Sequence, residues 1–251
     1  MAGHSKWANI KHRKASQDAK KGKIFTKLIR EITVSAREGG DDLNSNSRLR
    51  TAVNKARENN MPNDNIDRAI KKGTGALDGS TYEETRYEGY GPGGVAIMVD
   101  VLTDNKNRTM PEIRTIFSKN NGNLGENGCV SYLFDRKGII IIDGSDHNED
   151  DVMENLLEYD IEDIKTEDNN ITVTMTPESF NDVLDAIKEI KYPVIYNDIT
   201  FVPQTNVPLD EQKARQCMKL IDLLDEHDDV QNVYSNYDIS DEVMAKLSEE
   251  Q

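Results

Sequence analysis

The sequence predicts an α+β protein of three domains, in which a helical bundle precedes two sheet domains of the ferredoxin-like kind, the third inserted in the second. Two observations predict this order. Apolar residues recur at helical spacing up to about residue 72, alternate as in strands from residue 82, and return to helical spacing near residue 214. The 251 residues are enough for two or three small domains, each with a core of its own.

The first domain, residues 1–76, is expected to be a basic arm followed by three helices. In the segment 23–38, one helical stripe gathers the apolar residues Phe25, Leu28, Ile29, Ile32 and Ala36. Lys23, Lys27 and Arg30 then fall on the opposite face, which is expected to be free to bind. Further helices are expected at 47–59 and at 63–72, the last with Asn63 as its cap. This pattern predicts a three-helix bundle.

The second domain is expected over residues 77–129 and 204–238. Strand patterns cover 82–90 and 95–102, and a helix over 109–121 has Thr109 and Glu112 in capping-box spacing. Near the carboxyl end, one helix around 214–224 and one strand at 230–234 are too few elements to form a domain alone. We therefore expect them to complete the sheet that begins at residue 82.

The third domain is expected over residues 130–203, inserted between the two halves of the second. Its helices are expected around 152–159 and after Thr176 and Pro177, and its strands at 130–135, 139–143, 161–166, 171–175 and 194–202. The segment 203–208 is interpreted as a linker, and 239–251 as an acidic tail on the surface. The acidic pair at Asp228 and Asp229 is expected in a solvated loop or at the start of a helix.

Charge divides along the chain in the same way as the domains. The net charge is −15, but residues 1–76 hold 17 lysines and arginines against 8 acids, a net charge of +9. Residues 77–251 hold 14 against 38, a net charge of −24. An asymmetry of this size predicts that the first domain binds a polyanion while the remainder is repelled by it.

Motifs for catalysis, cofactors and metals do not occur in a supporting context. Residues 89–94 match GxGxxG, but a strand pattern follows where dinucleotide binding needs a helix, so a tight connection between strands is favoured. P-loop, HExxH and GxSxG patterns are missing from the sequence, and its two cysteines lie far apart. We therefore expect a protein of the cytoplasm that is not an enzyme, without cofactor, metal or membrane partner. An enzyme whose carboxylates converge only in the fold stays an open alternative.

The basic arm and the first helix supply the predicted nucleic-acid-binding residues. The helices at 47–59 and 63–72 resemble a helix-turn-helix, but Asp64 and Asp67 would meet phosphates at the start of a recognition helix. Lysine contacts the phosphate backbone more than base edges. Trp7 either stacks on an exposed base or packs the arm onto the bundle. The predicted set is Lys6, Trp7, Lys11, His12, Arg13, Lys14, Lys20, Lys21, Lys23, Lys27 and Arg30.

Several motifs spread over nearly the whole chain carry a family resemblance. They are AGHSKW at 2–7, IKHRK at 10–14, KIFTKL at 23–28, NNMP at 59–62, YEGYGPGG at 87–94, TDN at 103–105, NRT at 107–109 and GNLG at 122–125. In these motifs the chain resembles the YebC/PmpR family, which includes the mitochondrial translational activator of cytochrome c oxidase. The resemblance implies a helical bundle and two α+β domains, the third inserted in the second.

Two functions are expected from the resemblance and the charge pattern together. The family label, probable transcriptional regulators, implies a DNA-binding transcriptional regulator. The alternative is a ribosome-associated translation factor that binds ribosomal or transfer RNA through the same basic domain, with its acidic domains meeting ribosomal proteins. Few arginines or amides stand at a credible recognition-helix start, so the residues alone leave both open.

Overall fold

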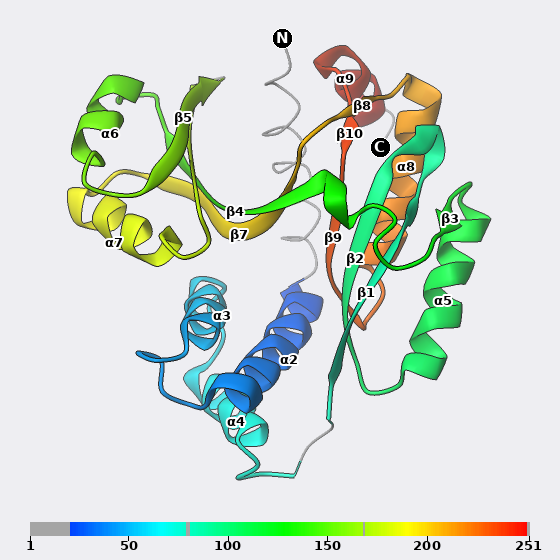
Figure 1. Ribbon diagram of the computed structural model, residues 1–251, viewed down its shortest axis with the longest axis horizontal. Helices are drawn as coiled ribbons and strands as arrows, with labels where there is room; N and C mark the ends of the chain where they lie inside the picture. The colour runs from blue at the N-terminus through cyan, green and yellow to red at the C-terminus, as the bar shows by residue number, and fades with distance from the viewer. Residues whose placement is uncertain (1–20, 79–80, 168, 250–251) are drawn as a thin grey trace. The chain divides into compact units, whose positions relative to one another are not determined.

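The computed structural model describes residues 21–78, 81–167 and 169–249 (Figure 1). These residues fall into two compact units. The larger unit lies within Asn9–Val130 and Leu209–Ser235, and the smaller unit within Ser131–Pro208 and Asn236–Gln251. Both contain helices and an antiparallel sheet, which confirms the predicted α+β class.

The described part of the larger unit begins with three helices: α2 (Lys21–Gly39), α3 (Ser47–Glu58) and α4 (Asn63–Gly73). Leu28 and Ile32 of α2 pack with Leu49, Val53 and Ile66 in one core cluster, because each helix has an apolar stripe at helical spacing. Gly73 allows α4 to approach α2 closely, since a Cβ there would come within 2.3 Å of the Thr33 carbonyl oxygen. Pro62, not Asn63, holds the cap position of α4, so the predicted Asn63 cap was wrong.

The sheet of the larger unit has the strand order β3-β1-β2-β9. Its strands are β1 (Glu83–Tyr90), β2 (Ala96–Thr103), β3 (Asn123–Leu124) and β9 (Val230–Ser235). Helices α5 (Lys106–Lys119) and α8 (Glu211–Asp225) cover one face of it (Figure 1). Val99 of β2 pairs with Val233 of β9, so the segment after residue 209 completes the sheet that begins with β1.

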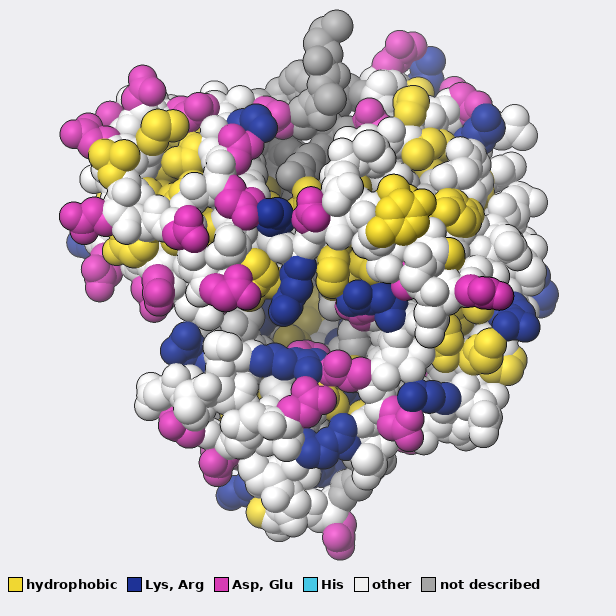
Figure 2. Space-filling view, in the orientation of Figure 1, with side chains coloured by type: hydrophobic (Ala, Val, Ile, Leu, Met, Phe, Trp, Pro, Cys, Tyr) yellow, Lys and Arg dark blue, Asp and Glu magenta, His cyan; other side chains and the backbone are white. Residues whose placement is uncertain are grey.

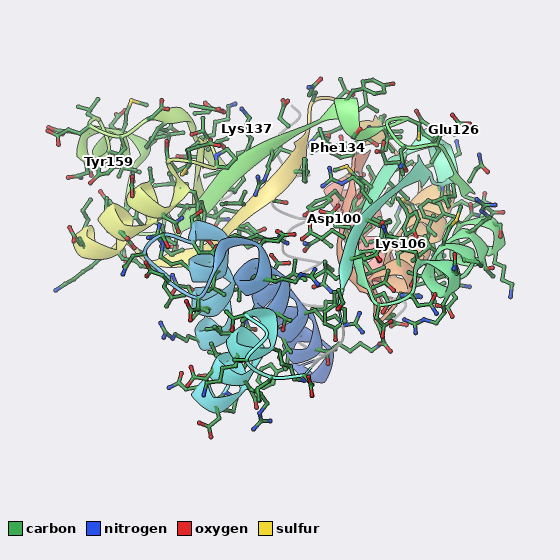
Figure 3. The ribbon with its side chains drawn as sticks, turned by 60° about the horizontal axis from the view of Figure 1, so that its bottom comes forward. Asp100, Lys106, Glu126, Phe134, Lys137 and Tyr159 are labelled. Carbon is green, nitrogen blue, oxygen red and sulfur yellow. The ribbon has the colours of Figure 1, made fainter. Side chains whose placement is uncertain are left out.

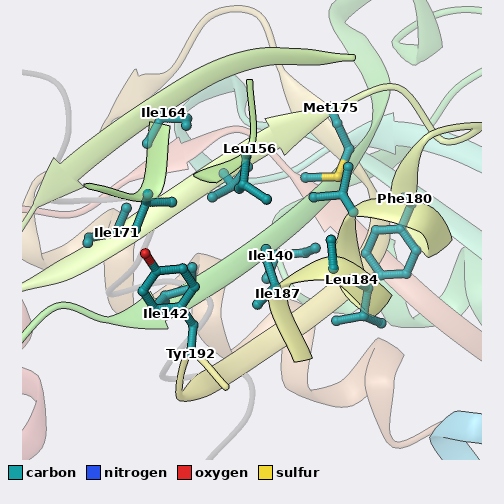
Figure 4. Packing of buried hydrophobic residues seen from close by; sticks show 14 residues of the cluster. Ile140, Ile142, Leu156, Ile164, Ile171, Met175, Phe180, Leu184, Ile187 and Tyr192 are labelled. Carbon is teal, nitrogen blue, oxygen red and sulfur yellow. The ribbon is translucent and has the colours of Figure 1, made fainter. Parts of the chain in front are cut away.

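The smaller unit has a sheet of order β5-β6-β4-β7 and the chain order βαββαβ. Its elements are a short 3₁₀ helix η2 (Ser131–Leu133), β4 (Phe134–Asp143), α6 (Glu149–Asn155), β5 (Ile161–Glu167), β6 (Asn170–Met175), α7 (Phe180–Ile190) and β7 (Val194–Pro203). Both helices lie over the same face, where Ile140 and Ile142 pack with Leu156, Phe180 and Ile187 (Figure 4). The alternation along β4 sends these isoleucines to one face.

One strand replaces the two expected at 130–135 and 139–143. Gly138, which stands between the two expected ranges, lies inside β4 and pairs with Met175 and Ile199. A Cβ at this position would come within 2.9 Å of both the Met175 and the Phe180 side chains. Packing of α7 and β6 against the strand, not a turn, therefore accounts for the glycine.

Two further boundaries differ from the expectation. Helix α5 begins at Lys106, because the Asn105 side chain accepts a hydrogen bond from the Arg108 amide, so the predicted Thr109 cap was wrong. The segment interpreted as an acidic tail forms α9 (Asp241–Glu249) with Leu247 buried. Before it, β10 (Tyr237–Asp238) pairs in parallel with β8 (Val207–Pro208), which lies in the expected linker.

Candidate nucleic-acid interface

The predicted binding set lies mostly outside the described residues. Its members there are Lys6, Trp7, Lys11, His12, Arg13, Lys14 and Lys20. Lys21 is the first residue of α2, and its side chain also lies outside the description. Lys23, Lys27 and Arg30 are described, and they share the face of α2 that the sequence predicts to be polar.

Two lysines of this face contact the carboxyl end of α8. The Lys23 ammonium donates a hydrogen bond of 2.6 Å to the Glu226 carbonyl oxygen and lies 3.7 Å from the Asp228 carboxylate. The Lys27 ammonium donates to the Asp225 carbonyl oxygen at 3.1 Å and lies 3.6 Å from its carboxylate. The last carbonyls of a helix have no partner within the helix and carry the negative end of its dipole, so cations are favoured there.

The third cation, Arg30, reaches a buried carboxylate. It donates to Asp229 Oδ1 at 2.7 Å and to the Leu102 carbonyl oxygen at 2.9 Å. Lys23, Lys27 and Arg30 are thus engaged inside the larger unit, because the acidic end of α8 and the residues after it lie against α2. The expectation that this face is free to bind was wrong for these three residues, and their contact with a nucleic acid stays a prediction.

Asp229 is the centre of a hydrogen-bond network. Only 2% of the residue is exposed, and its Oδ2 accepts from Thr109 at 2.6 Å, Arg108 at 2.8 Å and Thr103 at 3.0 Å. Burial alone would raise the pKa of this carboxyl. The hydrogen bonds from Thr109, Arg108, Arg30 and Thr103 outweigh burial and hold the pKa of Asp229 well below its usual range.

The network joins four segments of the larger unit. Arg30 comes from α2, Thr103 from the end of β2, Arg108 and Thr109 from α5, and Asp229 from the residue before β9. The expectation of a solvated loop was therefore wrong for Asp229, although Asp228 beside it is exposed. One signal was visible in the sequence, the polar run 103–109 after a buried strand, but nothing linked this run to residue 229.

Other cations of the bundle remain exposed or half-buried. On α4, Arg68, Lys71 and Lys72 share a side by helical spacing, as Arg50 and Arg57 do on α3. None of these five forms an ion pair with another residue in the described ranges. Arg48 differs, because its guanidinium is paired with Glu31, Glu38 and Glu84. The five unpaired cations extend the basic surface beyond the predicted set, and their spacing was visible in the sequence.

Residues 89–94 form a connection between strands. A 3₁₀ turn, η1 (Pro92–Gly94), joins β1 to β2, and the Gly91 amide donates to the Val95 carbonyl oxygen at 2.7 Å. Gly93 and Gly94 have φ angles of 78° and 80°, which favour glycine. A strand follows the turn, so no helix amino terminus is placed here for a dinucleotide phosphate.

Polar side chains further along β1 and β2, away from this turn, pair with one another. Lys106 at the start of α5 lies 2.8 Å from the Glu83 carboxylate, and Asp100 on β2 accepts from Arg86 at 2.6 Å (Figure 3). Within the described ranges, no three or more His, Cys, Asp or Glu side chains are grouped so as to hold a metal ion. Helices long and apolar enough to cross a membrane are also lacking there.

Comparison with known proteins matches both parts of the chain to the same family. A family described as the TACO1/YebC protein N-terminal domain matches residues 5–76, and the TACO1/YebC second and third domain matches residues 82–237. A relative from Natranaerobius thermophilus is 54% identical over 97% of this chain and 99% of its own length. One from Halothermothrix orenii is 54% identical over the whole of both chains. Both are named probable transcriptional regulatory protein.

A solved structure has the same fold. The conserved hypothetical protein Aq1575 from Aquifex aeolicus superposes with a TM-score of 0.78 and is 45% identical, covering 89% of this chain and 93% of that one.

Proposed function

Because the chain belongs to the TACO1/YebC family, we propose that it regulates gene expression by binding a nucleic acid through its amino-terminal domain, with duplex DNA as the first candidate. The observation that carries the proposal is the division of charge, +9 over residues 1–76 against −24 over residues 77–251. The names of the relatives support a role in transcription. The acidic remainder of the chain is repelled by phosphates, so the molecule approaches a polyanion with its amino-terminal domain.

Binding is expected to depend on backbone charge more than on base sequence. The first turn of α4 carries Asp64, and Asp67 follows it, both exposed. Carboxylates at the start of this helix oppose its entry into a major groove. Lysines of the arm and the exposed cations of α3 and α4 contact phosphates without reading bases.

RNA is the second candidate, and a specific residue favours it. Trp7 lies among the lysines of the arm, and an indole ring stacks well on unpaired bases of single strands and RNA loops. A ribosome-associated translation factor would bind ribosomal or transfer RNA in this way through the same basic domain. Both candidates use the same cations, so the bound nucleic acid decides between them.

Crosslinking in living cells, followed by sequencing of the attached nucleic acid, tests the proposal. We expect recovery of nucleic acid well above that of a variant in which Lys6, Lys11, Lys14 and Lys20 are replaced by alanine. Promoter DNA among the products supports a transcriptional regulator, and ribosomal or transfer RNA supports a translation factor. Equal recovery from both proteins would contradict binding through the amino-terminal domain.

Neutralising the acids beside α2 is expected to strengthen binding. In the variant Asp225→Asn with Asp228→Asn, Lys23 and Lys27 lose the carboxylates that lie beside them. The carbonyl oxygens that remain at the end of α8 compete less strongly with phosphates for the two ammonium groups. Two added contacts should steepen the slope of log affinity against log salt concentration by about 1.8. Fluorescence anisotropy with a labelled DNA duplex measures the slope.

The control is the variant Asp41→Asn with Asp64→Asn, which makes the same change of charge on exposed residues of the bundle. An equal gain from both variants would show that total charge, not release of Lys23 and Lys27, sets the affinity.

A further inference from the structure

Exposed apolar side chains gather at one place in the smaller unit. Leu157 is 73% exposed, Met153 44% and Tyr159 38%. Met153 lies on α6, and Leu157 and Tyr159 lie in the turn after it. Single exposed hydrophobic residues are ordinary on protein surfaces, but several together mark an interaction site.

Contacts beneath these residues hold the end of α6 on the rest of the unit. The Asn155 side chain donates to the Tyr192 hydroxyl at 2.9 Å, joining the end of α6 to the turn after α7. Leu156, Ile187 and Tyr192 belong to one buried cluster beneath them. The exposed residues therefore sit on a packed platform, and Figure 3 labels Tyr159 at the α6 side of it.

Acids surround the α6 side of this platform. Between Lys137 and Lys165 the sequence has ten aspartates and glutamates and not one lysine or arginine. Figure 2 shows hydrophobic side chains bordered by acidic ones over α6 and α7.

Part of this acidity stabilises the fold, and part does not. The Glu149 carboxylate accepts from the Thr166 amide at 2.9 Å, and acids in the first turn of α6 are favoured by the helix dipole. The side chains of four other acids around the exposed residues make no hydrogen bond or ion pair with any residue that the structure describes. These acids are Asp150, Glu154, Glu158 and Asp160. Asp150 and Glu154 stand four apart on α6, a spacing at which like charges repel.

We propose that this surface, the acid-bordered patch of Met153, Leu157 and Tyr159 with Asp150, Glu154, Glu158 and Asp160, binds a basic amphipathic segment of a partner protein. The apolar face of such a segment covers the exposed side chains, and its lysines or arginines pair with the carboxylates. Nucleic acids and anionic bilayers are repelled here. A second copy of this chain placed symmetrically would set the same acids against one another.

The carboxylates and the exposed apolar side chains together indicate a basic amphipathic partner. A solvated acidic surface accounts for the carboxylates but not for Leu157 at 73% exposure. An apolar partner accounts for Leu157 but leaves the four carboxylates without cations. The proposal is independent of nucleic-acid binding by the amino-terminal domain, because no residue of that domain is part of the patch.

A labelled synthetic helix of leucine and lysine is the probe, and a peptide with glutamate in place of every lysine is its matched control. Fluorescence anisotropy at about 0.15 M salt, where the Debye length is about 8 Å, measures binding to the full chain. We expect the lysine peptide to bind and the glutamate peptide not to bind. Met153→Ser with Leu157→Ser should weaken binding at least tenfold, since both side chains lose their burial. Glu154→Gln with Glu158→Gln should weaken it several-fold, and more at lower salt.

The control variant is Leu77→Ser with Met110→Ser, which removes two exposed apolar residues of the larger unit and should leave the affinity unchanged. All substituted residues are exposed, and circular dichroism confirms that each variant is folded. The proposal is overturned if the lysine peptide does not bind, if the glutamate peptide binds equally well, or if both serine variants behave alike.

Discussion

Replacing Asp229 by alanine is expected to lower the free energy of unfolding by about 3–5 kcal/mol, the range for removing one partner of a buried ion pair. The change leaves the half-buried guanidinium of Arg30 without its carboxylate and removes the acceptor of the Thr103 and Thr109 hydroxyls. Arg108 keeps Asp104 as a partner at 3.0 Å, so its loss is partial. Urea unfolding followed by circular dichroism measures the difference.

Asp228→Ala is the matched control, because that side chain is 77% exposed and its ammonium partner lies 3.7 Å away. An exposed pair of this kind contributes at most about 1 kcal/mol.

The pH dependence of the free energy of unfolding gives a second check. The pKa of Asp229 is depressed in the folded protein, so its contribution is present above the unfolded pKa of about 3.9 and is lost as pH falls below it. Variants at 228 and 229 that unfold alike near neutral pH would contradict the network.

Sequence periodicity predicted the helices and strands whose pattern lies within a single segment of the chain. The stripe from Phe25 to Ala36 gave helix α2 within two residues at its amino end, because 3.6-residue periodicity belongs to the segment itself. Gly138 shows where this reasoning fails. Glycine is compatible with a turn and with close packing, and only Met175 and Phe180, which come later in the chain, decide between them.

The candidate site was harder to predict for the same reason. The amino-acid composition predicted the positive charge of the site, and helical spacing predicted the polar face of α2. The acids that meet Lys23 and Lys27 lie about 200 residues further along the chain, and charge counted by segment cannot show that two segments meet. The buried network of Asp229 could not be predicted for the same reason, because its four partners come from three earlier segments. Its exposed neighbour Asp228 has the same side chain, so residue type did not distinguish the buried acid from the solvated one.

Removing four lysines of the arm is expected to have the largest effect on binding. In the variant Lys6→Ala, Lys11→Ala, Lys14→Ala and Lys20→Ala, four phosphate contacts are lost. We expect the affinity for a DNA duplex near 0.15 M salt to fall roughly a thousandfold, and the slope against log salt concentration to flatten by about 3.6. Lys23 stays in place, because its ammonium is already bonded to the Glu226 carbonyl oxygen. Fluorescence anisotropy over a range of salt concentrations gives both quantities.

A variant with the same loss of charge elsewhere makes the result specific. Alanine at the exposed residues Lys119, Lys165, Lys213 and Lys219 removes four positive charges from the acidic part of the chain. If total charge governs binding, the two variants should lose affinity equally. If the arm holds the phosphates, the control should keep the slope of the parent protein, since counterions are released only where cations contact the backbone. If the arm variant keeps the slope of the parent protein, the arm does not contact the phosphates, and the unpaired cations of α3 and α4 become the candidates.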